Sequence, residues 1–140
     1  MLFRSGGLLP TISGQVEQRR VSETRKQLDE IQQALIGYAV SNGHLPCPAV
    51  SFSVGTENRA ANGTCTGNKR VGFLPWSELG VSKTDSWGRI FLYSATLAFT
   101  NASPAAVFNL TSNRDITIQT RDSTGMLTNL SKSTDIPAVV

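Results

Sequence analysis

One long stretch without proline constrains the fold of this chain more than any other feature. Residues 13–41 contain no proline and consist largely of Gln, Glu, Arg, Leu, Ala and Lys, all of which tolerate a helix. Asn42 and Gly43, with prolines soon after them, provide a strong stop signal. A helix of about 28 residues is about 42 Å long at 1.5 Å per residue, longer than a small domain is wide. Part of the predicted helix, placed at residues 11–42, must therefore project beyond its own domain.

Apolar residues distinguish the two halves of this predicted helix. In the C-terminal half they recur at spacings of three and four, which gives a packing stripe that can lie on a sheet. The stripe consists of Leu28, Ile31, Leu35 and Tyr38. Between residues 15 and 27 only Val16 and Val21 are apolar, and charged residues dominate. The N-terminal half is therefore expected to project, and to be marginal unless it packs against neighbouring molecules.

Two cysteines, Cys47 and Cys65, lie in an irregular segment, residues 43–70, that is rich in Gly, Asn and Thr. A structural zinc site needs about four ligands, and the chain offers only these thiols and one histidine. We favour a disulfide over two free buried thiols, and a disulfide implies an oxidising compartment. It would close the loop and contribute on the order of 3 kcal/mol. Without it the loop is expected to be disordered.

The remaining residues, 71–140, predict a sheet. Three runs have the composition of strands: residues 89–96, 115–121 and 136–140. In the second run Ile116 and Ile118 are expected to share one face. A helix followed by strands indicates an α+β fold, a long N-terminal α-helix packed on a small antiparallel β-sheet. The length fits one domain, 1–140.

Catalytic motifs are largely missing from the sequence. The single histidine, His44, is interpreted as turn-exposed or capping, since no Gly-x-Ser-x-Gly elbow accompanies it. A phosphate-binding glycine motif and an EF-type calcium loop are absent too. The basic residues are scattered, so no nucleic acid is expected as a partner. We therefore predict no catalytic residue, cofactor or metal site, and no enzyme.

Some loop residues still leave alternatives open. One alternative is a cation held by oxygen atoms of loop aspartates, although ordinary turn aspartates are the favoured interpretation. These are Asp85, Asp115, Asp122 and Asp135.

Trp76 and Trp87 could form a platform for a sugar ring, but each lies beside Pro or Gly and apolar neighbours, which favours core anchors. We expect Trp87 to be largely buried, with Asp85 and Gly88 forming the turn before the strand.

Three features now coincide in one order: a long helix after Leu8-Leu9-Pro10, a proline-flanked Cys47, and Asp85-Ser-Trp-Gly88 before an aromatic run. In this combination the chain resembles the pilin-like proteins of type IV pili and type II secretion pseudopili. The turn and its strand are similar to the Asp-Pro-Trp-Gly motif of major pseudopilins, with Ser86 where proline is usual. The Gly43-His-Leu-Pro-Cys-Pro48 element, paired with residues 71–76, resembles a subgroup of prepilin-type proteins.

The resemblance implies a structural subunit, a minor pilin or pseudopilin, at the periplasmic face of a bacterial inner membrane or in a filament. Its partners would be other pilin or pseudopilin subunits and the inner-membrane assembly machinery. The family's basic leader, methylated residue and apolar helix half have no counterpart here, which we interpret as an N-terminal truncation, and the apolar end at Val140 as a C-terminal cut. The alternative is a periplasmic ligand-binding or adhesin-like module, with a site formed by Trp76, Trp87 and the Cys47 to Cys65 loop.

Overall fold

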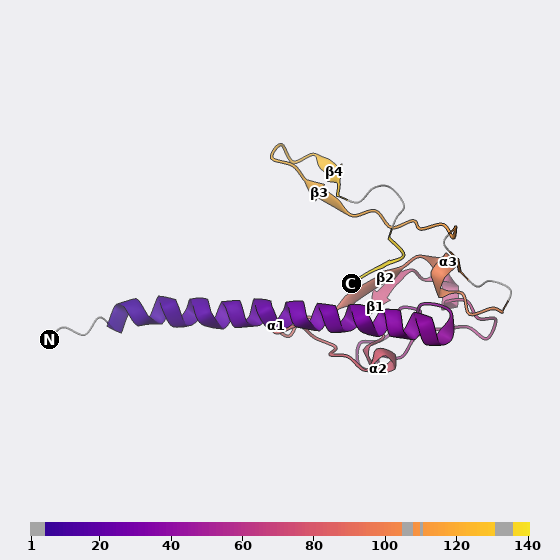
Figure 1. The fold of residues 1–140 in the computed structure, drawn as a ribbon, viewed down its shortest axis with the longest axis horizontal. Helices are drawn as coiled ribbons and strands as arrows, with labels where there is room; N and C mark the ends of the chain where they lie inside the picture. The colour runs from indigo at the N-terminus through magenta and orange to yellow at the C-terminus, as the bar shows by residue number, and fades with distance from the viewer. Residues whose placement is uncertain (1–4, 105–107, 110, 131–135) are drawn as a thin grey trace.

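A single helix, α1 (Ser5–Asn42), runs along most of the molecule (Figure 1). The computed structural model describes residues 5–104, 108–109, 111–130 and 136–140, with the side chains of α1 described from Ile12 onward. The helix stops where the sequence predicted: Gly43 adopts φ 75°, and its N–H donates to the carbonyl of Ala39 at 2.8 Å. An L side chain rarely adopts that φ, so glycine permits the chain to turn away from the helix axis.

The rest of the chain forms a head, the described residues from Gly43 onward, which covers the C-terminal half of α1 (Figure 1). Its main sheet is antiparallel with strand order β1-β2-β5. The strands are β1 (Val71–Phe73), β2 (Leu92–Ala95) and β5 (Ala138–Val139). The predicted fold class is confirmed: this is an α+β fold with one long helix packed on a small antiparallel sheet.

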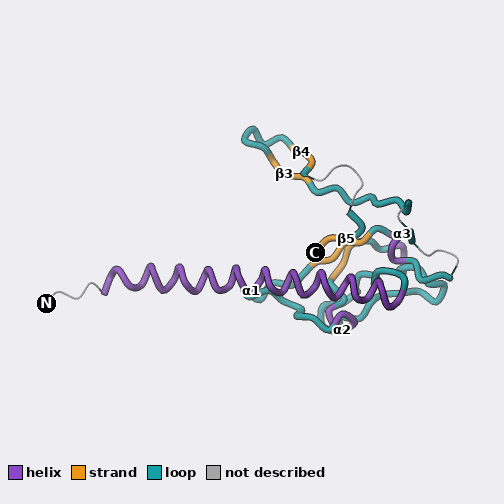
Figure 2. Tube along the Cα trace, viewed as in Figure 1, coloured by secondary structure: helices purple, strands orange, loops and turns teal. Residues whose placement is uncertain are grey.

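Most of the head consists of loops joined by short elements (Figure 2). These are η1 (Thr66–Asn68), α2 (Trp76–Leu79) and α3 (Leu97–Thr100). A two-stranded hairpin, β3 (Gln119–Arg121) and β4 (Leu127–Asn129), stands apart from the main sheet, and every residue of its strands is exposed (Figure 1). The hairpin therefore contributes nothing to the core.

The core lies between α1 and the main sheet. Ile31 and Leu35 from the helix pack with buried head residues, namely Leu45, Leu74, Tyr93, Ala95 and Phe99. The Tyr93 side chain crosses this core, and its hydroxyl donates to the carbonyl of Pro46 at 3.1 Å. Burial raises the pKa of Tyr93 above its ordinary value, so the phenol stays neutral and keeps donating.

The burial of the predicted packing stripe differs from the prediction at its N-terminal end. Ile31 and Leu35 are buried and Tyr38 is half-buried, whereas Leu28 is 37% exposed. Leu28 lines an open groove between α1 and the C-terminal strand instead of a closed core. The apolar contact of the head with the helix therefore ends near Ile31, and more of α1 lies outside the core than the sequence pattern indicated.

The strands are also shorter than their composition predicted. Residues 89–91 lie outside β2, because the Asp85 N–H donates to the Arg89 carbonyl at 2.9 Å and holds that end in a turn. Ile116 and Ile118 do not share an environment: Ile116 is buried and bridges Ile136, whereas Ile118 is exposed where the chain enters the hairpin. The hairpin departs from the main sheet after Ile116, which explains this difference.

Candidate functional site

The N-terminal part of α1 extends beyond the head (Figure 1). Within the described residues, hydrogen bonds from the head reach no further along the helix than Thr24, whose hydroxyl accepts from the Ser86 N–H at 3.3 Å. Gln27 donates to the Thr84 carbonyl, also at 3.3 Å. We call residues 12–23 the projecting half. All their side chains are exposed apart from Val21, which is half-buried.

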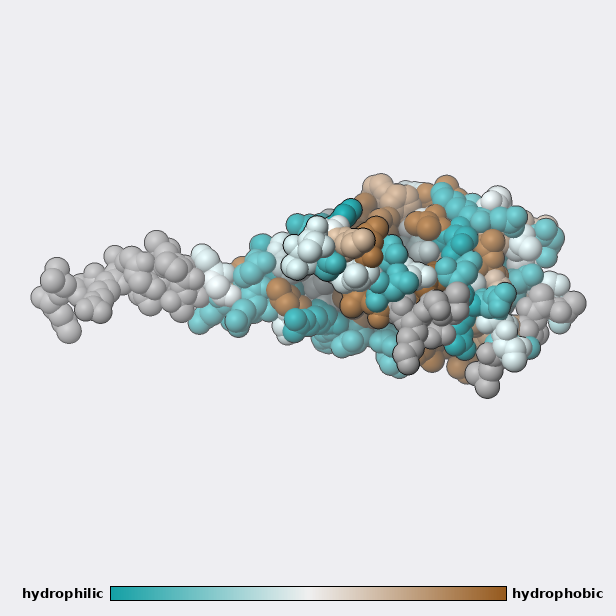
Figure 3. All heavy atoms as spheres, turned by 90° about the horizontal axis from the view of Figure 1, so that it is seen from above, coloured by the Kyte–Doolittle hydropathy of each residue, from teal (hydrophilic) through white to brown (hydrophobic). Residues whose placement is uncertain are grey.

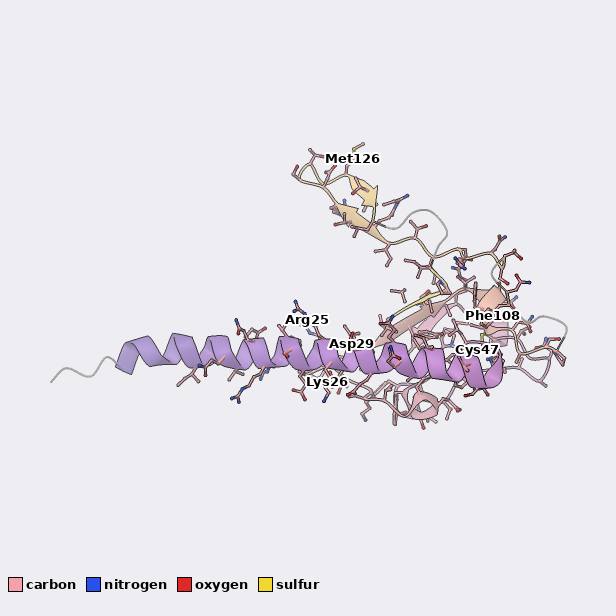
Figure 4. All side chains as sticks on the ribbon, viewed as in Figure 1. Arg25, Lys26, Asp29, Cys47, Phe108 and Met126 are labelled. Atoms are coloured by element: carbon pink, nitrogen blue, oxygen red, sulfur yellow. A yellow bond between two sulfur atoms is a disulfide. The ribbon has the colours of Figure 1, made fainter. Side chains whose placement is uncertain are left out.

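Charges of both signs cover the helix from Glu17 to Glu30. The described part of α1 contains one ion pair, between Lys26 and Glu30 at 3.9 Å, and both side chains are exposed. Figure 4 shows Arg25, Lys26 and Asp29 on this stretch of the helix. Surface pairs of this kind contribute little to stability. The charges are thus available to a neighbouring molecule.

The loop after the helix is closed by a disulfide between Cys47 and Cys65, with a Cα–Cα distance of 5.4 Å. Both cysteines are buried, as are Leu45 and Ala49 beside them. The loop therefore buries more of its own apolar surface than its composition indicated.

A polar cluster that the sequence did not predict ties this loop to the helix end. The Glu57 carboxylate accepts from the Cys47 N–H at 2.8 Å and from two nitrogens of Arg59 at 2.8 and 2.9 Å. The Tyr38 hydroxyl donates to it at 3.3 Å. Arg59 also donates to the carbonyl of Thr100. The pair therefore joins the loop to both α1 and α3.

Electrostatics in this cluster favour an ionised Glu57. Burial opposes its charge, but the hydrogen bonds from Arg59 and from the Cys47 N–H outweigh that effect and hold the pKa of Glu57 below its ordinary value. Burial and the Glu57 carboxylate raise the pKa of Tyr38 to about 12. One signal was present in the sequence: Glu57 and Arg59 are the only acidic residue and the only Lys or Arg between residues 44 and 68.

His44 is half-buried beside this cluster. Its Nδ1 lies 3.1 Å from Arg59 Nη2, and the Tyr38 ring meets it edge-on at 5.8 Å between centroids. Its described neighbours provide no nucleophile. His44 thus belongs to the packing of the helix end.

The Asp85 to Gly88 turn forms as expected, but its tryptophan does not pack against the core. Asp85 Oδ1 accepts from the N–H groups of Trp87 and Arg89 at 2.9 and 2.8 Å, and Gly88 adopts φ 79°. Trp87 is partly buried, as Trp76 is, but it lies outside the core, so it does not serve as the core anchor that the sequence favoured. The turn docks on α1 at Thr24, whose hydroxyl accepts from the Ser86 N–H.

Trp76 occupies the anchoring position instead. It packs against the core, and its indole N–H donates to the Phe52 carbonyl at 2.8 Å. Gly55 lies against the ring: a Cβ added at this glycine would lie 2.3 Å from the nearest atoms of the Trp76 indole. The ring pairs among the described residues do not include Trp76 with Trp87.

An open apolar groove of about 730 Å³ separates α1 from the C-terminal strand. Its walls include Leu28, Ile36 and Val40 from the helix, and Phe99 and Phe108 from the head. In the space-filling view hydrophobic residues gather over the head, whereas the described part of the projecting half is mostly hydrophilic (Figure 3). Aliphatic and aromatic residues make up most of the lining of this groove.

Metal-ligating side chains do not cluster among the described residues: no three of His, Cys, Asp and Glu come together there. Asp122 Oδ1 caps the hairpin turn by accepting from Thr124 and Met126, and these bonds lower the pKa of Asp122. Asp115 binds Arg70 and Thr96. Asp135 lies outside the described residues.

In the described part of the chain, no helix combines the length and the apolar character that crossing a membrane requires. Comparison of the sequence and the structure with protein-family models, curated proteins and solved structures finds no match to any of them. Function must therefore be argued from the geometry.

Proposed function

We propose that this chain is a structural subunit of a bacterial filament, a minor pilin or pseudopilin that assembles through its N-terminal helix. One observation carries the proposal. The projecting half of α1 extends past the head with its charged side chains exposed and, among the described residues, without hydrogen bonds from the head beyond Thr24.

An isolated helix segment of this length is marginal in water, and most helix stability in proteins comes from tertiary packing. A projecting half that stays helical in the folded chain therefore serves an interaction outside its own domain. Packing against the helices of neighbouring subunits supplies the missing contacts, and the heads would then face outward. The family resemblance of the helix, Cys47 and the Asp85 to Gly88 turn supports the same assembly.

The disulfide supports a location outside the reducing cytosol, because such bonds persist in oxidising compartments. On this proposal the head lies at the periplasmic face of the inner membrane or on a filament. The partners are other pilin or pseudopilin subunits and the inner-membrane machinery that adds them.

Gene deletion with complementation in the producing bacterium tests the proposal. Deletion should abolish a surface filament or the export of secreted proteins, and which of the two is lost separates a pilus from a secretion pseudopilus. Val16→Glu on the projecting half should fail to complement. Met126→Glu, at an exposed apolar residue on the hairpin, is the matched control and should complement. Unchanged filaments and secretion after deletion would overturn the proposal.

A second candidate is a periplasmic ligand-binding module, favoured by the apolar groove between α1 and the C-terminal strand. Such a groove would take an apolar ligand, because most of its lining residues are aliphatic or aromatic. Saturable displacement of a fluorescent apolar probe, lost in Phe99→Ala, together with unaffected filaments in the deletion strain, would favour this function over the structural one.

A further inference from the structure

The main sheet ends at β5, and the main-chain groups on the outer side of this strand can be identified from its pairing with β2. The carbonyl of Pro137 accepts from the Thr96 N–H at 2.8 Å, so Pro137 faces β2. Ala138 lies opposite Ala95, but the Ala95 N–H donates to Arg70 on the far side of β2, at 2.9 Å. Successive residues of a strand direct these groups to opposite sides. The N–H and C=O groups of Ala138 therefore point away from β2, and no described residue hydrogen bonds to them.

The apolar groove lies along this edge. Ala138 and Val139 line its sheet side, and Ile36 and Val40 are among the residues that line its helix side. Ile36 is 50% exposed and Val40 is 81% exposed, so three strands leave part of the apolar surface of α1 uncovered. Leu35 lines the groove and also belongs to the core, which shows that the groove continues the seam between α1 and the sheet. One more strand beside β5 would extend the sheet over this surface.

The lining of the groove indicates the chemistry of its occupant. Every described residue in the lining is uncharged, and Gln32 is the only polar one among them. Apolar side chains therefore suit the groove. A small apolar ligand would cover the N–H and C=O groups of Ala138 without pairing them, which costs free energy. An extended polypeptide supplies both kinds of contact, main-chain hydrogen bonds for the edge and alternate side chains for the groove.

We propose that a partner protein adds an extended segment to the outer edge of β5, antiparallel like the rest of the sheet, with apolar residues at every second position. In an antiparallel pair, the segment residue opposite Ala138 exchanges both hydrogen bonds with it, and the two side chains share one face of the sheet. Because the Ala138 side chain lines the groove, the side chain opposite it enters the groove. This interaction goes beyond the helix-mediated assembly proposed above and does not depend on it.

N-methylated peptides test the main-chain pairing. The probe is a fluorescently labelled synthetic peptide of repeated Val-Thr units flanked by lysines, titrated against the purified full chain and followed by fluorescence anisotropy. Valine side chains should enter the groove, so the valine N–H groups should face β5 and the threonine N–H groups should face solvent. Methylation of every valine nitrogen should therefore weaken binding roughly tenfold or more, relative to methylation of every threonine nitrogen.

Substitutions in α1 test the groove. Ile36→Glu places a carboxylate in the lining and should weaken binding of the unmodified peptide roughly tenfold or more. Ile12→Glu is the matched control, because Ile12 is 53% exposed on the same helix and lies outside the groove lining. Amide hydrogen exchange supplies a readout without a substitution: the Ala138 amide should exchange rapidly in the free chain and slowly when the peptide is bound.

Three results would overturn strand addition. Equal affinities of the two methylated peptides would show that the main chain does not pair, and the groove would then accept apolar ligands in general. Binding that Ile36→Glu leaves unchanged would place the peptide elsewhere. Absence of saturable binding of the unmodified peptide would remove the interaction altogether. None of these results bears on filaments or secretion in the deletion strain, so the assembly function is decided separately.

Discussion

Glu57 and Arg59 hold the disulfide loop against the end of α1 and against α3. The pKa of Glu57 is lowered in the folded state, so its ionised form stabilises the fold. This contribution is present above the ordinary pKa of 4.5 and is lost as the pH falls through the lowered value.

Glu57→Gln should therefore lower the free energy of unfolding at neutral pH by on the order of 1 to 3 kcal/mol, because Arg59 loses a charged partner. In Glu57→Gln the free energy of unfolding should also decrease less as the pH is lowered from neutral. Urea midpoints measured from neutral pH down to below 4.5 check both effects. Glu78→Gln, at an exposed residue of α2, is the control. An unchanged pH profile in Glu57→Gln would refute the role assigned to this cluster.

The two tryptophans should respond differently to truncation. Trp76 packs on the core and donates to Phe52, whereas Trp87 lies outside the core. Fully buried Trp→Ala changes cost about 3 to 5 kcal/mol, so we expect about 2 to 3 kcal/mol for the half-buried Trp76 and less for Trp87. Urea denaturation of both variants measures the difference. A larger loss in Trp87→Ala than in Trp76→Ala would contradict the assignment of Trp76 as the anchor.

At the scale of elements, the disulfide loop is held by two kinds of contact, the bond itself and the Glu57 and Arg59 cluster. Replacing both cysteines by serine should remove about 3 kcal/mol from the free energy of unfolding. The fold should nevertheless survive in the absence of denaturant, because the cluster remains. Denaturation curves and near-ultraviolet circular dichroism test this. Two reactive thiols in the native, oxidised wild-type protein would show that the bond is not formed.

Elements set by local chemistry could be predicted from the sequence. The helix and its end at Gly43 follow from propensity and from the φ that glycine tolerates. The Asp85 turn follows from side-chain capping of its own backbone. Features that depend on distant partners could not be predicted. The partners of the Trp76 ring, Gly55 beneath it and the Phe52 carbonyl, come from a distant loop, and the exposure of Leu28 depends on where the head ends.

For the whole molecule, the head and the C-terminal half of α1 share one core, and the rest of the helix extends beyond the head (Figure 1). Because the projecting half has no apolar stripe, the purified chain alone should be mostly monomeric. Sedimentation at tens of micromolar should show one small species. A stable closed oligomer would contradict this expectation and favour the ligand-binding module.

The central claim is that this chain assembles through its projecting helix, and site-specific photo-crosslinking in the producing bacterium tests it most directly. A photoreactive amino acid at Val16, which is 42% exposed on the projecting half, should form adducts whose crosslinked peptides map to the N-terminal helix of a second subunit. The same probe at Met126, which is 70% exposed on the hairpin, should give no helix adducts. Helix adducts from Met126, or none from Val16 where the protein is correctly folded and located, would contradict the claim.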